Sequence, residues 1–449
     1  MNAGETICAI ATGIGGAVSV IRISGPEAES VCSGLWRSLA GAELSALPPR
    51  MLVLGSVRSK EKGVLDPSCL AVRMPAPNSF TGENVVELHC HGGALCTRAV
   101  LAALLEAGAR SAEPGEFSKR AFLNGKIDLV QAEAIADLIS AGSDAALTVA
   151  GNQLDGVLGR RIRSSQEALQ GILAEVESRL DFPEEDLDWK PEAELREVIG
   201  GVREDIDRLA ATRAGGELLR GGVTLVIAGP PNAGKSTLLN RMLGRDRAIV
   251  SEIPGTTRDT IEATVQIHGI PFHLVDTAGI RDGSADAIEN AGMERTRRCA
   301  ENARLVVWLM DATRPEQEQA FPGWKLRGTL LTIANKCDAA SARIPSEALS
   351  VSALTGDGIE ALYAAMKESV LPGESSPEAS EIAVAARHAD LLQQAAAHLE
   401  TALPRLEAGD WELLAFDLRE AIAALRRITG ETVPYDVLDT IFSTFCIGK

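Results

Sequence analysis

One stretch, GPPNAGKST at positions 229–237, constrains the fold of this chain more than any other feature. It fits the pattern G-x-x-x-x-G-K-[ST], follows the apolar run VTLVIA and precedes STLLNRML, whose periodicity favours a helix. Gly229 and Gly234 let backbone N–H groups wrap around phosphates, and the helix N-terminus adds a positive dipole end. The stretch therefore predicts a phosphate-binding loop between a buried strand and a helix.

Neighbouring residues predict the metal-binding groups. Lys235 is expected to reach the outer phosphates and Ser236 to ligate Mg²⁺. FHLVDTAG predicts a second strand that ends at Asp276, the acid expected to hold the Mg²⁺ shell. Between these motifs, Thr256 and Thr257 of GTTRD are candidates for a switch segment ordered by phosphate and metal.

A further motif, NKCD, predicts the choice of base. The carboxylate of Asp338 can accept hydrogen bonds from N1–H and the 2-amino group of guanine, which adenine cannot offer. Adenine would leave that carboxylate unpaired, at a cost of about 1–3 kcal/mol. The backbone of Ser352 and Ala353 in VSALTG can approach guanine O6. Four motifs in order, each at a strand end, predict a GTP-binding domain and disfavour ATP.

The residues alone leave the catalytic group for hydrolysis open. Ile280 follows DTAG, where many switch GTPases place a water-orienting glutamine. Four carboxylates in the next segment are candidates, although composition favours solvated helix charges: Glu289, Asp282, Asp286 and Glu294. Arg258 and Arg281 are available as arginine fingers, but no spacing identifies one. Asn232 in the phosphate loop either helps to hold a monovalent cation or tolerates a tight turn.

Length and periodicity predict several domains. A chain of 449 residues exceeds the size at which one hydrophobic core keeps growing. We expect a small α+β domain over residues 1–124, helices over 125–218, strands alternating with helices over 219–371, and helices again over 372–449. LPGESSPEASE is typical of a linker, and the helices on either side of the inserted domain are expected to pack together.

Composition indicates the surroundings of the protein. Asp and Glu outnumber Lys and Arg by 62 to 44, and the net charge of −18 argues against broad coating of nucleic acids or anionic membranes. Eight cysteines without a C-x-x-C pair indicate a reducing, cytosolic setting. No signal-peptide pattern is present and no segment approaches the roughly 18 apolar residues of a membrane span, so we expect neither secretion nor insertion.

From end to end, the chain resembles the MnmE family of tRNA-modification GTPases. The nucleotide motifs fit many GTPases, whereas NSFTGENVVELHCHGG, FLNGKIDLVQAEAIADLI and the tail FCIGK are specific to this family. The resemblance implies a multidomain α/β chain. It combines a small α+β folate-binding and dimerisation domain, an all-α helical domain, and an inserted Ras-like P-loop GTPase domain with a mostly parallel sheet.

The resemblance also implies an activity. Together with an FAD-containing partner, MnmG, such proteins add an aminomethyl or carboxymethylaminomethyl group to carbon 5 of the wobble uridine of certain tRNAs. The one-carbon donor is 5,10-methylenetetrahydrofolate or a related tetrahydrofolate, and FAD enters only through the partner. The G domains of a cytoplasmic homodimer meet around K⁺ when GTP is hydrolysed, which fits the missing glutamine.

Roles at the nucleotide site carry over by position. Asn232, Ser251, Ile253 and Thr256 match K⁺ ligands, Ser236 and Thr257 match Mg²⁺ ligands, and Glu289 matches a catalytic glutamate that positions water indirectly. The implied GTP-binding positions are Asn232, Ala233, Gly234, Lys235, Ser236, Thr237, Ser251, Glu252, Ile253, Pro254, Gly255, Thr256, Thr257, Asp276, Thr277, Ala278, Gly279, Asn335, Lys336, Asp338, Ser352 and Ala353.

For the folate site, the matching residues are Arg22, Glu87, Lys126 and Lys449. Arg and Lys suit an anionic glutamyl tail, and a carboxylate can accept hydrogen bonds from the N–H edge of a pterin. Without the resemblance, Arg22 would be an ordinary strand-edge charge and Lys126 a surface lysine.

The histidine pair and the tail have competing explanations. His89 and His91 face the same side of a strand, but no third metal ligand is recognisable, so structural hydrogen bonding is preferred. Cys446 stands where a prenylation signal would place it, yet Gly448 and Lys449 do not fit that signal. The resemblance places the tail at the folate site, with Cys446 as a candidate catalytic thiol; a packing thiol is the alternative.

Two other functions stay open as alternatives. A ribosome-associated GTPase, which is a binding switch without chemistry of its own, would share the nucleotide motifs. A small-molecule kinase is disfavoured by NKCD and by the absence of a lid-like, Arg-rich segment.

Overall fold

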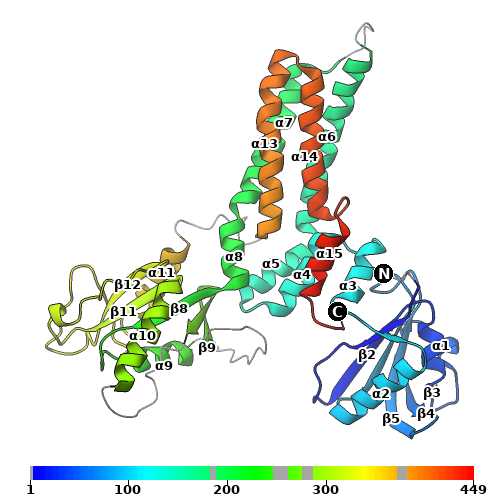
Figure 1. The fold of residues 1–449 in the computed structure, drawn as a ribbon, viewed down its shortest axis with the longest axis horizontal. Helices are drawn as coiled ribbons and strands as arrows, with labels where there is room; N and C mark the ends of the chain where they lie inside the picture. The colour runs from blue at the N-terminus through cyan, green and yellow to red at the C-terminus, as the bar shows by residue number, and fades with distance from the viewer. Residues whose placement is uncertain (1–3, 183–188, 246–260, 276–286, 372–381, 449) are drawn as a thin grey trace. The chain divides into compact units, whose positions relative to one another are not determined.

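A computed structural model describes residues 4–182, 189–245, 261–275, 287–371 and 382–448, without the side chains of residues 245, 261–262 and 287–293. Its contacts separate two units. The first comprises Met1–Ala136, Gly159–Arg163 and Leu425–Lys449, and the second comprises Asp137–Leu158 and Ser164–Ala424. Segments from both ends of the sequence therefore belong to one unit (Figure 1).

The first unit is built on a seven-stranded sheet in the order β3-β4-β5-β6-β2-β1-β7. Neighbouring strands are antiparallel except β1 and β7, which are parallel. The strands are β1 (Ile7–Ile10), β2 (Val18–Ser24), β3 (Trp36–Ser38), β4 (Val53–Ser59), β5 (Gly63–Met74), β6 (Val85–His91) and β7 (Arg110–Ser111).

The alternation of residues in β6 separates a core face from a polar face. Val86, Leu88 and Cys90 are buried in a core shared with α1 (Ala28–Ser33) and α2 (Ala94–Glu106). Glu87 and His89 alternate with these residues and so point to the opposite face of the sheet, where both are only half-buried.

A second core in this unit joins helices α3 (Glu116–Leu123), α4 (Leu129–Ser140) and α15 (Tyr435–Ser443). Its buried members are Leu129, Ala132, Leu438, Phe442 and Phe445. The start of α4 is fixed locally by a reciprocal cap: the Asp128 carboxylate accepts from Gln131 N at 2.9 Å, and the Gln131 amide oxygen accepts from Asp128 N at 3.0 Å.

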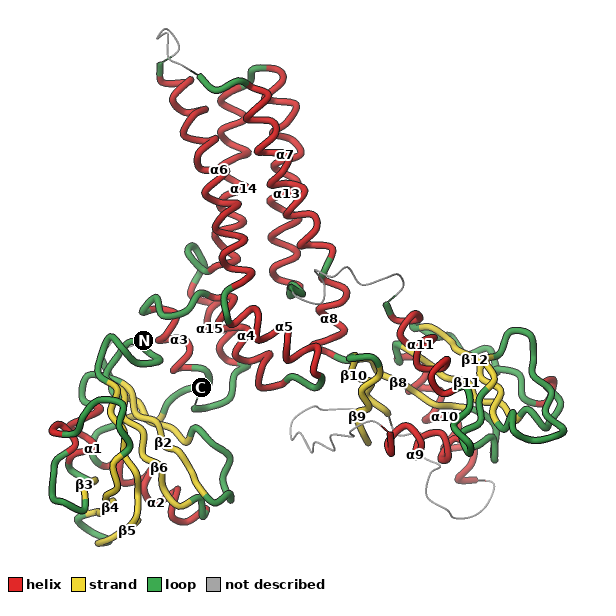
Figure 2. Tube along the Cα trace, turned by 180° about the vertical axis from the view of Figure 1, so that it is seen from behind, coloured by secondary structure: helices red, strands yellow, loops and turns green. Residues whose placement is uncertain are grey.

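The second unit contains a bundle of long helices: α6 (Val157–Asp181), α7 (Glu192–Ala211), α13 (Ala386–Ala408) and α14 (Trp411–Thr429). Two shorter helices, α5 (Asp144–Leu154) and α8 (Arg213–Gly221), lie at its base. Helices α7 and α13 lie side by side in both views (Figures 1 and 2), and ion pairs Arg203–Glu400 and Arg196–Glu407 link them. Helices from either side of the inserted segment therefore pack together, as the periodicity predicts.

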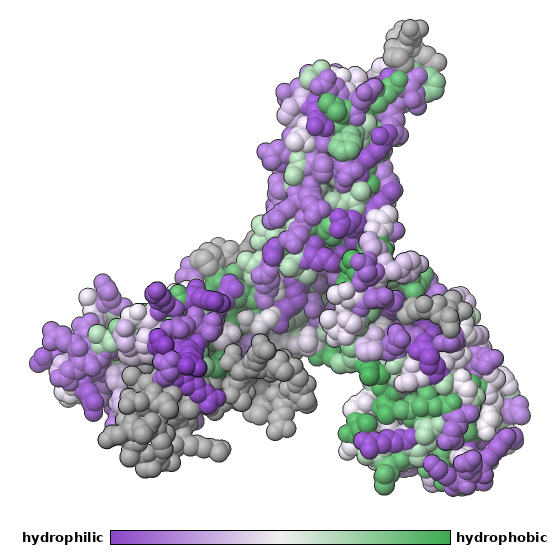
Figure 3. Space-filling model, viewed as in Figure 1, coloured by the Kyte–Doolittle hydropathy of each residue, from purple (hydrophilic) through white to green (hydrophobic). Residues whose placement is uncertain are grey.

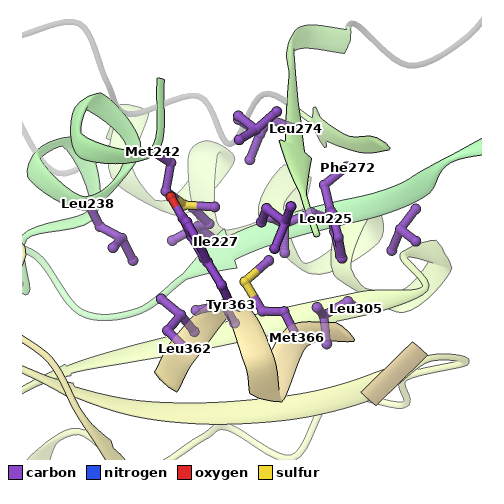
Figure 4. Close-up of a cluster of buried hydrophobic side chains, with 14 of the residues drawn as sticks. Leu225, Ile227, Leu238, Met242, Phe272, Leu274, Leu305, Leu362, Tyr363 and Met366 are labelled. Atoms are coloured by element: carbon purple, nitrogen blue, oxygen red, sulfur yellow. The ribbon is translucent and has the colours of Figure 1, made fainter. Parts of the chain in front are cut away.

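The inserted segment forms a six-stranded sheet in the order β13-β12-β11-β8-β10-β9. All its pairs are parallel except that of β9 with β10. Its elements are β8 (Val223–Ala228), α9 (Lys235–Arg245), β9 (Ile261–Ile267), β10 (Ile270–Val275), α10 (Ala287–Asn302), β11 (Leu305–Asp311), β12 (Thr329–Asn335), β13 (Leu349–Ser350) and α11 (Ile359–Val370). Apolar side chains from strands β8, β10 and β11 meet those of α9 and α11 in one core (Figure 4).

One connection departs from the predicted alternation of strands and helices. The parallel strands β11 and β12 are joined by residues 312–328, whose only helical piece is the 3₁₀ turn Glu316–Glu318. An aromatic cluster covers the sheet there instead: the rings of Phe321 and Trp324 lie 5.3 and 5.7 Å from that of Trp308, edge to face. At this connection, packed aromatic rings rather than a crossover helix bury the face of the strand.

The multidomain α/β fold with a mostly parallel inserted sheet is confirmed, whereas the domain boundaries at residues 124, 218 and 371 stay predictions. The proposed linker lies largely outside the described residues. Among the helices of the described part, none combines the length and the apolar character that a bilayer crossing requires.

Candidate functional site

The phosphate loop has the geometry that its glycines predict. It runs from the end of β8 to the start of α9. Gly229 and Gly234 have φ values of +153° and +97°, and a Cβ on either would overlap Leu309 O or the Asn335 amide. Asn232 also adopts a positive φ of +63° and is exposed. The loop therefore presents a tight backbone turn that only small or turn-forming residues tolerate.

Lys235 begins α9, and its ammonium group lies back over the loop. Nζ donates to the carbonyls of Gly229 and Pro230, both at 2.9 Å. Ser236 and Thr237 follow in the first helical turn with exposed side chains. One ammonium and two hydroxyl groups thus surround the positive end of the helix, which suits phosphate and Mg²⁺.

Asn335 joins three of the predicted motifs. Its side chain is 2% exposed; Nδ2 donates to Ala233 O at 2.8 Å and Oδ1 accepts from Ala353 N at 2.9 Å. The phosphate loop, the NKCD segment and the Ser352–Ala353 segment are therefore held at one edge of the sheet. The amide of Asn335 organises the site from within.

Lys336 and Asp338, the other two predicted residues of the motif, differ in their surroundings. Asp338 is exposed, so its carboxylate is accessible to a base. Lys336 is strained at φ +65°, and its Nζ lies 2.6 Å from Oδ2 of Asp311 at the end of β11. Burial by itself raises the pKa of the Asp311 carboxyl, but hydrogen bonds from Lys336 and Thr313 outweigh it, so its pKa lies below the ordinary value.

Several predicted residues fall outside the described part of the chain. They are the switch and strand-end positions Ser251, Glu252, Ile253, Pro254, Gly255, Thr256, Thr257, Asp276, Thr277, Ala278 and Gly279, and the tail residue Lys449. Glu289 lies in α10, but its side chain is not described. β10 ends at Val275, directly before Asp276, as the motif predicts.

Arg22 and Glu87 come together on the polar face of the first sheet. They are opposite each other on β2 and β6, and Arg22 Nε donates to Glu87 Oε1 at 2.8 Å. The guanidinium lies between two rings, 5.6 Å from Phe80 and 5.7 Å from Phe117. The result is a charged pair beside two aromatic rings, of which Phe80 is half-buried and Phe117 is fully buried.

The histidines make structural hydrogen bonds. His89 Nε2 lies 3.4 Å from Glu87 Oε2, and this contact together with the charge of Arg22 lowers the pKa of the Glu87 carboxyl against the effect of burial. His91 Nδ1 lies 2.8 Å from the fully buried carboxylate of Asp66. Both histidines therefore make the structural hydrogen bonds that the sequence favours for them.

Lys126 is exposed and approaches the same region from the loop before α4. Its Nζ donates to Pro77 O at 3.0 Å, in the segment that carries Phe80. Glu83 at the end of that segment accepts from Ser24 Oγ at 2.7 Å and from Arg120 at 3.0 Å. Three of the four predicted folate-binding residues therefore contact one another or the loop between β5 and β6.

The tail packs against the start of the chain. Phe445 is buried, and Cys446 O accepts from Gly115 N at 3.4 Å. Gly448 has a φ of +99°, and a Cβ there would overlap Ile10 O at the end of β1. Cys446 itself is a free, exposed cysteine. A thiol exposed in this way is accessible to small molecules. The tail is therefore held by contacts other than packing of the Cys446 side chain.

Comparison with known proteins decides the family. The model of the MnmE helical domain matches residues 129–446, and that of the GTP-binding protein TrmE N-terminus matches residues 6–126. A tRNA modification GTPase MnmE from Akkermansia muciniphila is 44% identical to this chain, with 99% of each sequence covered. The chain belongs to the MnmE family of tRNA modification GTPases.

Other MnmE proteins are similar over their whole length. That of Geobacter sulfurreducens is 42% identical with 99% of both sequences covered, and that of Xanthomonas campestris is 42% identical with complete coverage of both. The family resemblance carried by the motifs is thus confirmed. The roles of individual MnmE site residues stay predictions.

Motif reasoning missed Asp311, which holds the lysine of the NKCD motif. A signal for it is present in the sequence: a single acid directly follows the buried run LVVWLM. In a parallel sheet the carboxyl ends of the strands form one edge, so a polar residue at that position faces the same site as the known motifs.

Proposed function

We propose that this chain binds and hydrolyses GTP and that it uses this hydrolysis in the modification of tRNA. The observation that carries the nucleotide part is the Asn335 amide, which holds the phosphate loop and the Ser352–Ala353 segment together. A nucleotide placed with its phosphates on the loop then has its base beside Asp338.

Base recognition is proposed to rest on Asp338. In an Asp338→Asn variant, an amide replaces the carboxylate that accepts two hydrogen bonds from guanine, and we expect at least about tenfold weaker GTP binding. The same amide can donate to the 2-oxo group of xanthine, so binding of xanthosine triphosphate is expected to rise. Equal affinity of the parent and variant proteins for GTP would remove Asp338 from this role.

For hydrolysis, we propose that Ser236, Thr257 and Asp276 hold Mg²⁺, that Asn232, Ser251, Ile253 and Thr256 hold K⁺, and that Glu289 orients water. The exposed hydroxyl of Ser236 and the exposed amide of Asn232 supply the oxygen ligands that such cations prefer. K⁺ would supply positive charge near the phosphates. GTP turnover should be faster in KCl than in NaCl, and the difference should be lost in Asn232→Ala.

The one-carbon chemistry is proposed for the polar face of the first sheet, with Arg22, Glu87, Lys126 and Lys449 binding a tetrahydrofolate. The charged pair beside the half-buried ring of Phe80 supports this, because it offers hydrogen-bond donors, an acceptor and an aromatic neighbour. Calorimetry with 5-formyltetrahydrofolate, a stable analogue, should show binding that Arg22→Ala abolishes and that Arg58→Ala, an exposed arginine on β4, leaves intact.

Assembly is proposed as a homodimer that binds the FAD-containing MnmG and tRNA in the cytoplasm. The first unit exposes three large apolar side chains at and just before the start of β4: Met51, Leu52 and Leu54. Figure 3 shows apolar residues gathered on this domain. Exposed patches of this kind mark protein interfaces. Leu54→Asp is expected to shift the protein from dimer to monomer in sedimentation equilibrium.

The whole proposal is tested by the nucleosides of tRNA. Mass spectrometry of cells that lack this protein should show loss of the aminomethyl-type groups at carbon 5 of wobble uridines, restored by the parent gene. Unchanged wobble uridines would contradict the tRNA part, and nucleotide binding would then favour a ribosome-associated switch.

A further inference from the structure

The lysine of the NKCD motif forms an ion pair with an acidic residue of the neighbouring strand. Lys336 follows β12, and its Nζ lies 2.6 Å from Oδ2 of Asp311, the terminal residue of β11. The pairing is fixed by the sheet, because β11 and β12 are parallel and Asp311 stands directly beside Asn335. The Lys336 side chain therefore has a defined direction along the edge of the sheet.

Asp311 is itself buried and fixed by several hydrogen bonds. Its side chain is 5% exposed, and Oδ1 accepts from the backbone N and the hydroxyl of Thr313 at 2.9 and 2.6 Å. Its backbone N donates to Oε1 of Gln319 at 2.7 Å, and Gln319 Nε2 donates to Asp311 O at 3.0 Å. A buried carboxylate with this many donors is rigid, and so is a lysine bound to it.

The backbone conformation of Lys336 explains why its side chain needs this ion pair to be ordered. Its φ of +65° is unfavourable for a residue with a side chain. This backbone conformation does not by itself fix the direction of the lysine side chain, so contacts must fix it. Free lysine side chains lose much rotamer entropy when they become ordered. The Asp311 carboxylate imposes this order before any nucleotide binds.

We propose that Asp311 is a positioning residue for the guanine base. Asp311 holds the Lys336 side chain in place beside Asp338 before the nucleotide binds, and in this way Asp311 sets how long the nucleotide stays bound. This inference rests on the proposed GTP site. The segment Thr313–Gln319 then belongs to the nucleotide site, because Thr313 and Gln319 hold Asp311 in place.

The test uses the full-length protein and a fluorescent GDP. Asp311→Asn keeps the shape of the side chain but removes the charge that pairs with Lys336. We expect about tenfold weaker binding, seen mainly as faster dissociation in stopped flow. In GTP turnover, the loss should fall on KM rather than on kcat. The control is Arg314→Ala: Arg314 is half-exposed and its Nε lies 4.0 Å from the same carboxylate, so its removal should leave affinity unchanged.

A double-mutant cycle separates positioning from general support of the fold. If Asp311 acts through Lys336, then Asp311→Asn adds nothing to the affinity already lost in Lys336→Met. Fully additive losses, or an Asp311→Asn variant with parental dissociation, would overturn the proposal. Asp311→Ser removes the same carboxylate and replaces Asp311→Asn in the cycle if the latter lowers the melting temperature. A parent protein that does not bind GDP contradicts the proposed function itself, whatever the variants do.

Discussion

At the scale of single residues, Gly448 has the strictest steric requirement in the tail. Its φ of +99° belongs to glycine, and its Cα faces Ile10 O so closely that no Cβ fits between them. Nothing in FCIGK as a string indicates this contact, because the partner lies at the other end of the sequence. The contact explains why the tail has a fixed path beyond the end of α15.

Gly448→Ala should detach the tail from β1. A side chain there must displace either Ile10 or the tail, at about 1–3 kcal/mol, so we expect roughly tenfold weaker binding of 5-formyltetrahydrofolate. The neighbouring Ile447 is 59% exposed, and Ile447→Ala should bind the analogue as the parent does. An equal loss of affinity in both variants would show that binding depends on the residues of the tail in general rather than on the contact of Gly448 with Ile10.

Glu116 is a second residue whose effect can be predicted, this time as a function of pH. It is 1% exposed and accepts from Arg110 at 2.6 Å and Arg120 at 2.9 Å. Burial by itself raises the pKa of its carboxyl, but these hydrogen bonds and one from Glu113 N lower it below 4.5 overall. Its contribution to stability is therefore present above that pH and is lost as the pH falls through the lowered folded-state pKa.

Glu116→Gln should reduce the free energy of unfolding by about 3 kcal/mol at neutral pH, because two arginines lose their buried charge partner. Urea unfolding from pH 7 down to about pH 3 should show the gap between parent and variant closing with acidity. Glu113→Gln, at an exposed position, is the control. A gap that stays constant with pH would assign the loss to packing rather than to charge.

At the scale of elements, the β11–β12 connection shows what periodicity predicts and what it does not. The strands were predictable because LVVWLM is a continuous apolar run and TLLTIAN is a short, mainly apolar and β-branched segment that leads into the polar NKCD motif. The missing helix was not, because Phe321 and Trp324 lie in a Pro- and Gly-containing stretch without a helical period. Their role depends on ring contacts with Trp308, which only the folded sheet brings about.

Trp324→Ala should destabilise the inserted α/β segment by about 2 kcal/mol, since a half-buried ring and its edge-to-face contacts are lost without helical hydrogen bonds to hold the connection. The stability of this segment can be measured by thermal unfolding, with the release of a fluorescent nucleotide as the signal. Lys325→Ala, at the exposed neighbour, should melt like the parent. A Trp324→Ala variant of parental stability would mean that Phe321 and Trp308 alone cover the sheet.

At the scale of the whole molecule, both connections of the inserted segment meet at α8. Arg220 donates to the carbonyls of Ala383 and Val384 at 3.1 and 2.6 Å, and Gln153 donates to Ala383 O at 2.7 Å. The chain therefore leaves and re-enters the helical bundle at neighbouring points, which a short linker can join.

Replacing residues 222–382 with a short Gly/Ser linker should leave a folded protein. We expect a cooperative melt with the helical circular dichroism of α7 packed on α13, undiminished binding of 5-formyltetrahydrofolate, and no GTP binding. The matched design with the linker placed between residues 200 and 382 cuts through α7 and should not fold. Loss of helicity in the first design would contradict the proposed domain boundaries.

The site was predictable wherever its chemistry lies in short segments of sequence. The phosphate loop and NKCD can be recognised from local motifs, because backbone turns and strand ends position their groups. Arg22 and Glu87 required a family resemblance, since their pairing depends on the register of β2 with β6. Asp311 required the sheet order, because β11 and β12 bring it to Lys336 and nothing in the spacing of the two residues encodes that contact.

The contact of Gly448 with Ile10 also has a consequence for biosynthesis. β1 leaves the ribosome early, whereas the tail that packs against it follows only after the helical bundle and the α/β segment have been made, roughly 20 to 90 seconds later at about 5–20 residues per second. During that interval the N-terminal sheet lacks the tail. A nascent or prematurely terminated chain can therefore carry a complete phosphate loop and NKCD motif while the proposed one-carbon site still lacks the tail.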